Sequence, residues 1–491
     1  MPDLTSISIL LYFALLIFIG VYAMKKSTAD NSEYLLGGRK VSAKVTALSA
    51  GASDMSGWML MGLPGAAFVS GLENIWLAAG LVLGAYLNYQ FVAPRLRVFT
   101  ELADNALTIP EFFSKRFALD KGSIRLISAI IIILFFTVYT ASGLVAGGKL
   151  FESAFGIHYA WGIAATVAVV VVYTVLGGFL AVSLTDFIQG LIMLIALIAV
   201  PIVCFTQLDS QQAVAFTGAL NLSLGNIELI TALSLMTWGL GYFGQPHIIV
   251  RFMAIKSHTE LPQARRIGLS WMIISIAGAL ATGLVGASYI TQTQINIKDP
   301  ETIFIFLSQH LFHPFIAGWF LAAILAAIMS TISSQLLVSS SSLVEDIYKS
   351  YTNKQPSDKE LLIASRTCVI AVAVVASLIA LDSTSSVLSL VANAWAGFGA
   401  AFGPLILLSL WWKKLSHSGA VAGVLVGALT VIIWAYVPLA EGKTLNSYFY
   451  ELLPGFIAST LAIIVVSLKT KQPDTQAITW FEASIKKLTS S

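Results

Sequence analysis

A single carboxylate, Asp54, lies in the middle of an apolar segment that runs from about residue 45 to residue 69. If this segment crosses a membrane, the carboxylate lies near the bilayer midplane, where an ionised side chain costs at least ~2.5–3.5 kcal/mol. Nearby glycines and Pro64 favour a helix that breaks and exposes backbone groups. Such a carboxylate is typical of an ion and substrate site in a secondary transporter, and the alternative is a Gly-rich packing face with one paired Asp.

The backbone around Asp54 offers ligands of two kinds if the helix unwinds there. Freed carbonyl oxygens, together with the hydroxyls of Ser53 and Ser56, are the oxygen ligands that a hard cation such as sodium prefers. Freed N–H groups around Ser56, Gly57 and Trp58 suit a substrate carboxylate at the start of the second half-helix.

A second cluster consists of the hydroxyls of Ser330, Thr331, Ser333 and Ser334, deep in the apolar segment 315–347. Helical spacing puts Ser330 on one face with Ser333 or Ser334. Such hydroxyls commonly bond back to their own helix or to a neighbouring one. Next to a broken helix, the cluster favours ion ligation.

The third cluster lies in residues 238–246, which contain a formal G-x-G-x-x-G pattern. A dinucleotide fingerprint must follow a strand and open a helix of a soluble domain, so that interpretation is discarded. The pattern instead predicts a second broken helix, with Trp238 and Tyr242 on one face. These rings, with Tyr139 as a further wall, can enclose a small and mostly apolar substrate. The alternative is that each ring only packs against neighbouring helices.

Asp186 is the other acidic residue within a predicted span, near its inner end. Two interpretations stay open. Either Asp186 relays sodium or gates the inner side, or it pairs with an inner arginine.

The composition predicts an all-α polytopic membrane protein, because 57% of the 491 residues are hydrophobic and only 11% are charged. A spanning helix needs ~20 apolar residues. About thirteen segments qualify: they lie near 6–24, 45–71, 74–94, 124–152, 158–177, 179–207, 227–245, 263–290, 315–347, 360–381, 384–412, 417–437 and 447–468.

The distribution of basic residues predicts the orientation. With the N-terminus outside and the C-terminus in the cytoplasm, all but three of the 28 Lys and Arg residues fall on the inner side. The exceptions are Lys149, Lys298 and Lys443. The net charge of +3 therefore reflects membrane topology, and nucleic-acid binding is not indicated.

No enzyme is predicted. The two cysteines define neither a disulfide framework nor a metal site, and the six histidines form no ligand pattern. No P-loop, nucleophile elbow or metalloprotease motif occurs, so neither ATP hydrolysis nor an organic cofactor is expected.

Several stretches closely resemble bacterial members of the solute:sodium symporter family. They are residues 36–39 (LGGR), 49–65 (SAGASDMSGWMLMGLPG), 238–247 (WGLGYFGQPH), 325–331 (LAAIMST) and 394–404 (AWAGFGAAFGP). The resemblance runs from about residue 33 to residue 468. It implies one transporter domain over 1–491 with a LeuT-type core of two five-helix inverted repeats, at 45–207 and 227–412. The first helix is then peripheral, and 413–491 hold two further helices and a cytoplasmic tail.

The resemblance also implies roles for individual residues. It places the sodium ligands, which are three backbone carbonyls, two hydroxyls and one carboxylate, at Ala52, Met55, Ala327, Ser330, Thr331 and Asp54. It places the residues that contact the substrate at Ser56, Gly57, Trp58, Tyr139, Trp238, Tyr242 and Pro246. It implies that Arg39, on the inner side, influences coupling, and that Asp186 lies near the inner exit.

The expected function is sodium-coupled uptake of L-proline by alternating access in a bacterial inner membrane. Its expected partners are L-proline, sodium ions and the lipid bilayer, with no obligatory protein partner. One alternative is a sodium symporter for another small solute with a carboxylate or an amine. The other is a membrane sensor with weak or no transport, although the chain shows no soluble signalling domain.

Overall fold

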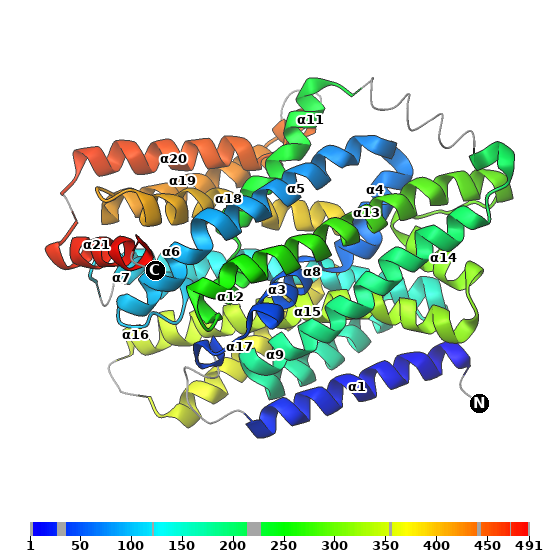
Figure 1. Cartoon of the computed structure of the whole chain (residues 1–491), viewed down its shortest axis with the longest axis horizontal. Coiled ribbons are helices and arrows are strands. Elements are labelled where there is room, and N and C mark those ends of the chain that lie inside the picture. The colour runs from blue at the N-terminus through cyan, green and yellow to red at the C-terminus, as the bar shows by residue number, and fades with distance from the viewer. Residues whose placement is uncertain are drawn as a thin grey trace.

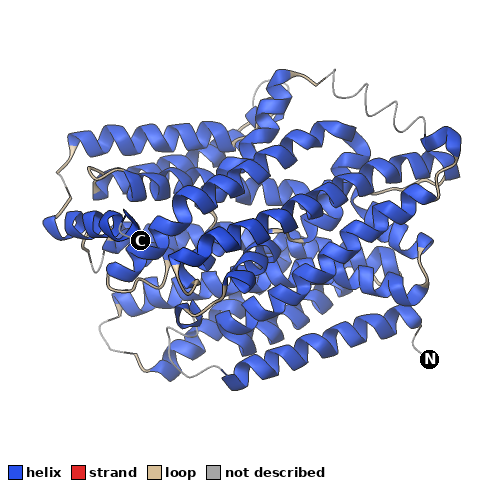
Figure 2. Ribbon diagram, in the orientation of Figure 1, coloured by secondary structure: helices blue, strands red, loops and turns tan. Residues whose placement is uncertain are grey.

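The computed structural model describes residues 3–26, 36–119, 122–213, 227–352, 356–438, 443–471 and 473–489. Within these ranges the chain is helical and forms no strand beyond two isolated β-bridges (Figure 2). Nine of the described helices are long and apolar enough to cross a membrane, and shorter apolar helices cover Leu4–Ile19, Tyr159–Val172 and Leu229–Gly244. The predicted polytopic α-helical class is confirmed, whereas the number thirteen stays a prediction.

Most of the long helices pack side by side along one common direction, whereas α11 crosses it steeply (Figure 1). The first half of the chain contains α1 (Leu4–Lys26), η1 (Gly37–Arg39), α3 (Ala43–Asp54), η2 (Trp58–Gly62), α4 (Leu63–Ser70), η3 (Gly71–Asn74), α5 (Ile75–Leu87), η4 (Asn88–Val92), α6 (Ala93–Leu102), α7 (Ile109–Lys115), α8 (Ser123–Phe155) and α9 (Tyr159–Thr206). The second half contains α11 (Leu229–Met236), η5 (Thr237–Gly244), α12 (Pro246–Ala254), η6 (His258–Glu260), α13 (Leu261–Thr293), η7 (Pro300–Thr302), α14 (Ile303–Leu311), α15 (Pro314–Ser341), η8 (Ser342–Tyr348), α16 (Lys349–Tyr351), α17 (Asp358–Ala380), α18 (Val387–Trp411), α19 (His417–Tyr436), η10 (Leu445–Ser447), α20 (Leu452–Lys469) and α21 (Thr475–Thr489).

The first predicted broken helix is present. Helix α3 ends at Asp54, and Met55 leaves the helical conformation with φ −86° and ψ 80°. The chain resumes as the π-helical turn η2, which continues into α4. The break therefore falls within the Gly-rich stretch that carries the carboxylate.

The second predicted broken helix is also present, and it extends further than the sequence indicated. After α11 and η5, Gln245 takes an extended conformation with φ −82° and ψ 105°. Helix α12 then starts at Pro246, whose ring is tolerated at the first helical position because no N–H is needed there. The span expected at 227–245 is thus only the first half of a longer interrupted element.

The glycines of the G-x-G-x-x-G pattern allow close helix packing. A Cβ atom on Gly239 would lie 2.1 Å from the carbonyl oxygen of Gly80, and a Cβ atom on Gly84 would lie 2.1 Å from that of Gly239. Helix α5 and η5 therefore meet backbone to backbone, which any side chain at these positions would prevent.

Helix α1 lies at the edge of the bundle, against α9 and α15 (Figure 1). The Tyr12 hydroxyl accepts a hydrogen bond from Gln189 Nε2 at 3.0 Å and lies 3.8 Å from Met329 Sδ.

At the other end of the chain, the expected polar tail contains α21, which packs on α6. The Arg116 guanidinium lies 5.0 Å from the centre of the Phe481 ring of α21.

Candidate functional site

The hydroxyl cluster of α15 meets the break that follows α3. Ser330 Oγ donates to the carbonyl oxygen of Ala52 at 2.7 Å and lies 3.1 Å from that of Ala327. Thr331 Oγ1 also lies near the Ala52 oxygen, at 3.4 Å. The Ala52 carbonyl is available because the last carbonyls of a helix have no partner within it. Two carbonyl oxygens and two hydroxyls thus converge, as a hard cation requires.

Two of the other predicted ligands lie at the same break but are not joined to these hydroxyls. Among the described residues, no hydrogen bond connects the Met55 carbonyl or the Asp54 carboxylate with Ser330 or Thr331. The Asp54 carboxylate instead accepts a hydrogen bond from the Tyr242 hydroxyl. This bond links the break after α3 to η5, the first part of the second broken helix.

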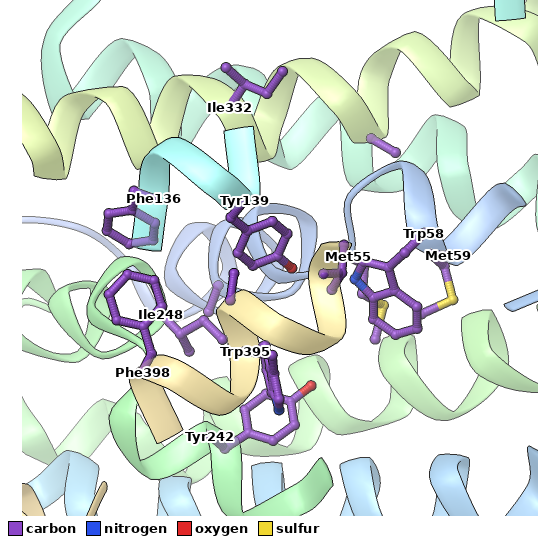
Figure 3. Close-up of a cluster of buried hydrophobic side chains, with 14 of the residues drawn as sticks. Met55, Trp58, Met59, Phe136, Tyr139, Tyr242, Ile248, Ile332, Trp395 and Phe398 are labelled. Carbon is purple, nitrogen blue, oxygen red and sulfur yellow. The ribbon is translucent and has the colours of Figure 1, made fainter. Parts of the chain in front are cut away.

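Aromatic side chains surround the first break (Figure 3). The backbone carbonyl of Asp54 accepts hydrogen bonds from the Trp58 indole at 3.2 Å and from the Tyr139 hydroxyl at 3.3 Å. The Trp58 N–H approaches Ser56 Oγ at 3.5 Å. The predicted residues Ser56, Trp58, Tyr139 and Tyr242 are therefore brought together within one buried region.

Trp238 belongs to an aromatic stack that the sequence did not predict. Its ring stacks on Tyr450, with centroids 5.1 Å apart, and its carbonyl accepts a hydrogen bond from the Trp395 indole at 2.8 Å. The Trp395 ring also meets the Tyr242 ring edge-on at 5.1 Å. Trp395 lies in one of the family-like stretches, which is the signal that could have identified it.

The start of α12 adds polar groups near Tyr139. Gln245 Nε2 donates to the Trp395 carbonyl at 3.1 Å, which fixes the turn just before Pro246. The His247 ring is fully buried and meets the Tyr139 ring edge-on, with centroids 5.8 Å apart. No feature of the sequence predicted a role for His247.

Asp186 pairs with Arg251, which is the contact that one of the two interpretations left open for it predicted. Arg251 Nη2 lies 3.4 Å from the Asp186 carboxylate and 2.5 Å from Ser334 Oγ, and the Ser49 hydroxyl donates to the same carboxylate at 2.8 Å. These side chains come from α3, α9, α12 and α15. The network therefore ties four helices together on the side where α12 ends.

Arg39 ties the segment before α3 to its surroundings. Its guanidinium donates to Asn105 Oδ1 at 2.6 Å and to the carbonyls of Met253 and Ala106, each at 2.7 Å. Burial lowers the pKa of Arg39 to about 10, so its positive charge is retained at neutral pH. Because Met253 lies in the last turn of α12, this charge also complements the helix C-terminus.

The opposite end of the bundle, which is the outer end in the predicted orientation, is tied by a set of contacts that we term the outer clasp, made of Lys149, Glu301, Ser386, Val387 and Leu388. The Glu301 carboxylate accepts from Lys149 Nζ at 2.7 Å, from Ser386 Oγ at 2.9 Å, and from the N–H groups of Val387 and Leu388 at 3.0 and 3.1 Å. It thereby joins α8, η7 and the start of α18. The sequence placed Lys149 outside but gave no sign of this partner.

Comparisons with known proteins agree with this geometry. The sequence profile described as "SSF: Sodium:solute symporter family" matches residues 34–427. The chain is 54% identical to sodium/proline symporter 2 of Staphylococcus saprophyticus, with coverage of 96% of this chain and 93% of the relative. It is also 54% identical to the osmoregulated proline transporter OpuE of Bacillus subtilis, with coverage of 95% of each chain.

Two solved structures share the fold. A sodium-coupled sialic acid symporter in a substrate-bound outward-open state superposes with a TM-score of 0.82 at 22% identity, covering 96% of this chain and 99% of that one. A nucleobase-cation-symport-1 family transporter superposes with a TM-score of 0.57 at 14% identity, covering 93% of this chain and 99% of that one. The bundle is therefore a LeuT-type transporter core.

Proposed function

Because this chain belongs to the sodium:solute symporter family, we propose that it carries L-proline into the cell together with sodium by alternating access. It is a multi-pass membrane protein and not an enzyme. We place it in a bacterial plasma membrane with the N-terminus outside and the C-terminus inside. The observation that carries the proposal is the meeting of the α15 hydroxyls with the broken helix after α3.

We assign the coupling ion to the junction of α3 and α15. Its ligands are the carbonyls of Ala52, Met55 and Ala327 and the hydroxyls of Ser330 and Thr331. The short contacts among four of these groups support the assignment, because an ion there would replace the hydroxyl-to-carbonyl hydrogen bonds with direct coordination. Sodium bound at this junction holds two helices together and favours one arrangement of the bundle.

We assign the substrate to the region between the two broken helices. L-Proline is compact, with an apolar ring and a zwitterionic end. The N–H groups near Ser56 and Gly57 suit its carboxylate, while Trp58, Tyr139, Trp238, Tyr242 and Pro246 enclose the ring. Larger or charged side chains are rejected by size and because a buried charge would stay unpaired. All these rings are buried, so the substrate enters only when the surrounding helices separate.

Alternating access requires the two ends of the bundle to open in turn. The outer clasp closes one end, and the groups around Arg39 and the Asp186–Arg251 pair close the other. We propose that these contacts exchange as the repeats 45–207 and 227–412 rearrange, while α19 and α20 lie outside them. An inside-negative membrane potential favours uptake by ~2.3 kcal/mol per 100 mV for each sodium charge that enters.

The function is tested by uptake of radiolabelled L-proline into liposomes that contain the purified protein and have an imposed sodium gradient. Uptake should depend on the gradient and should accelerate with an inside-negative potential. A panel of unlabelled solutes competes in parallel. A different solute that competes better than L-proline would replace the substrate assignment, and the absence of any gradient-driven uptake would refute symport.

The sodium ligands give a first expected outcome. Ser330→Ala or Thr331→Ala should raise the sodium concentration for half-maximal uptake by about tenfold, because each removes one of the few oxygen ligands. The matched control is Ser333→Ala, because within the described part of the chain its buried hydroxyl bonds only to the Ser330 carbonyl, at 3.2 Å. Sodium titrations of uptake in the three variants measure the difference. Unchanged sodium dependence in both test variants would remove these hydroxyls from the site.

The aromatic walls give a second expected outcome. Trp238→Ala and Tyr139→Ala should weaken L-proline binding by roughly tenfold and sodium binding by much less, since each removes a large apolar surface. Calorimetry on the purified protein measures both ligands. Sodium should raise proline affinity by the same factor by which proline raises sodium affinity. Proline binding that ignores sodium would contradict the coupling.

A further inference from the structure

Among the described residues, the Asp54 carboxylate is hydrogen-bonded to Tyr242 of η5 and to no hydroxyl of α15. One of its oxygens accepts from Tyr242, and the other, Oδ1, has no hydrogen-bond partner among the described residues. The residue is only 2% exposed. Nor does any described ion pair include this carboxylate. An unpaired buried carboxylate oxygen requires a physical explanation, because leaving a buried charge without compensation is costly.

A small cavity lies at this carboxylate. Its volume is about 20 Å³, and its lining includes Asp54, Asn88, Tyr89, Tyr242 and Met272. A space of ~10–15 Å³ already holds one water-sized particle. The lining residues include no Lys, Arg or His, so the protein itself supplies no positive charge to this cavity.

Two further lining residues also carry an oxygen that has no partner in the described part of the chain. These oxygens are the amide oxygen of Asn88 and the hydroxyl of Tyr89, both on buried side chains. Both residues open the π-helical turn η4, where the extra residue per turn redirects side chains. Three residues from two separate elements, each with a buried oxygen that has no partner in the described residues, therefore line one cavity.

The surrounding contacts hold these oxygens in place. Asn88 Nδ2 donates to the Tyr242 carbonyl at 3.0 Å, so the amide oxygen of Asn88 is the end that stays available. The Tyr89 ring packs on Phe252, with centroids 4.7 Å apart. The Tyr242 hydroxyl donates to Asp54 and keeps its lone pairs free to accept. The ligands are thus positioned before any ion arrives.

We propose that Asp54, Asn88, Tyr89 and Tyr242 form a second cation site, separate from the junction of Ser330 with Ala52. One carboxylate, one amide oxygen and two phenol oxygens suit a small monovalent cation, and the cavity admits one such group. The cation is either a sodium ion or the ammonium group of the substrate. The proposal rests on the sodium-coupled uptake proposed above, and it assigns the Asp54 carboxylate to this second site.

The test measures binding to the purified full-length protein with radioactive sodium and with radiolabelled L-proline. Tyr89→Phe removes only the hydroxyl, and Asn88→Leu replaces the amide with an apolar group of similar size. The matched control is Ser459→Ala on α20, because that hydroxyl is equally buried and has no partner in the described residues. Thermal stability of each purified variant separates lost binding from lost folding.

Two results support the proposal and identify the cation. If the cation is sodium, the sodium concentration that half-saturates binding without L-proline should rise by about fivefold or more in both variants. This is the change expected when one ligand interaction is lost. If the cation is the ammonium group of the substrate, sodium binding in the absence of L-proline should be unchanged. The L-proline concentration that half-saturates binding should then rise by about fivefold or more. In that second case cyclopentanecarboxylate, which lacks the amine, competes equally well in wild type and variants.

The proposal is overturned if both variants bind both ligands within about twofold of Ser459→Ala, a difference below the value of one hydrogen bond. This result would leave the proposed function intact, because that function is judged on gradient-driven uptake by the wild-type protein. A wild-type protein without such uptake would instead refute the function while leaving its cation binding measurable.

Discussion

Sodium-driven uptake of L-proline is expected to fall by about 100-fold or more in Asp54→Asn, while the protein still inserts into the membrane. The carboxylate is 2% exposed, lies at a helix break and accepts from Tyr242. A neutral amide at this position cannot offset the desolvation of a cation. The measurement is initial uptake by proteoliposomes under a fixed sodium gradient, with the amount of inserted protein determined in the same preparation.

Tyr242→Phe is the informative companion to Asp54→Asn. It removes the donor to the carboxylate but keeps the charge, so uptake should fall by only about tenfold. If Asp54→Asn transports normally, the carboxylate is either structural or already protonated, and its assignment to cation binding fails. If both variants lose uptake equally, the hydrogen bond and the charge act as one unit.

Glu301→Gln is expected to lower L-proline uptake by about tenfold or more without lowering L-proline binding from the outside. The carboxylate accepts from four donors in the outer clasp, including Lys149, whose Nζ lies 2.7 Å away. Glu301→Gln removes the buried partner of Lys149 and leaves it only the more exposed Asp299, and the loss of one partner of a buried pair costs up to ~3–5 kcal/mol. Losing this contact destabilises the arrangement in which the outer end is closed. L-Proline therefore still binds from the outside, but the outer end closes less often.

Asp299→Asn is the matched control for the outer clasp. Asp299 also contacts Lys149, at 2.9 Å, but its side chain is 38% exposed, and an exposed pair contributes at most about 1 kcal/mol. Uptake should therefore stay within about threefold to fivefold of wild type. If uptake falls equally in Glu301→Gln and Asp299→Asn, the negative charge near Lys149 controls the rate, and the specific contacts of Glu301 do not.

The parts of the site that depend on local chemistry could be predicted from the sequence. A carboxylate among glycines in an apolar segment predicted the break after α3, and the cluster of glycines before Pro246 predicted the break before α12. The hydroxyls near Ser330 could be identified because four of them fall within five residues of an apolar helix. The family resemblance supplied the specific carbonyl ligands, which no side-chain pattern reveals.

The parts that depend on tertiary distance could not be predicted. Asp186 allowed two interpretations because its partner, Arg251, lies 65 positions away and reaches it only after α12 packs on α3. The outer clasp depends on a residue in a short connection, Glu301, capping a helix that starts 86 positions later. Trp395 has no sequence feature that marks it as the donor to the Trp238 carbonyl. The hydrogen bond from Tyr242 to the Asp54 carboxylate was not predicted for the same reason.

Helix α1 has a consequence for measuring the transport cycle. It packs on α9, which belongs to the first proposed repeat, and on α15, which belongs to the second, and Tyr12 contacts both. When the repeats move relative to each other, α1 can keep its contact with only one of them. Spin labels on α1 paired with labels on α9 and on α15 should therefore give one distance that stays constant and one that changes with sodium and L-proline. The constant pair identifies the repeat with which α1 moves as one rigid unit.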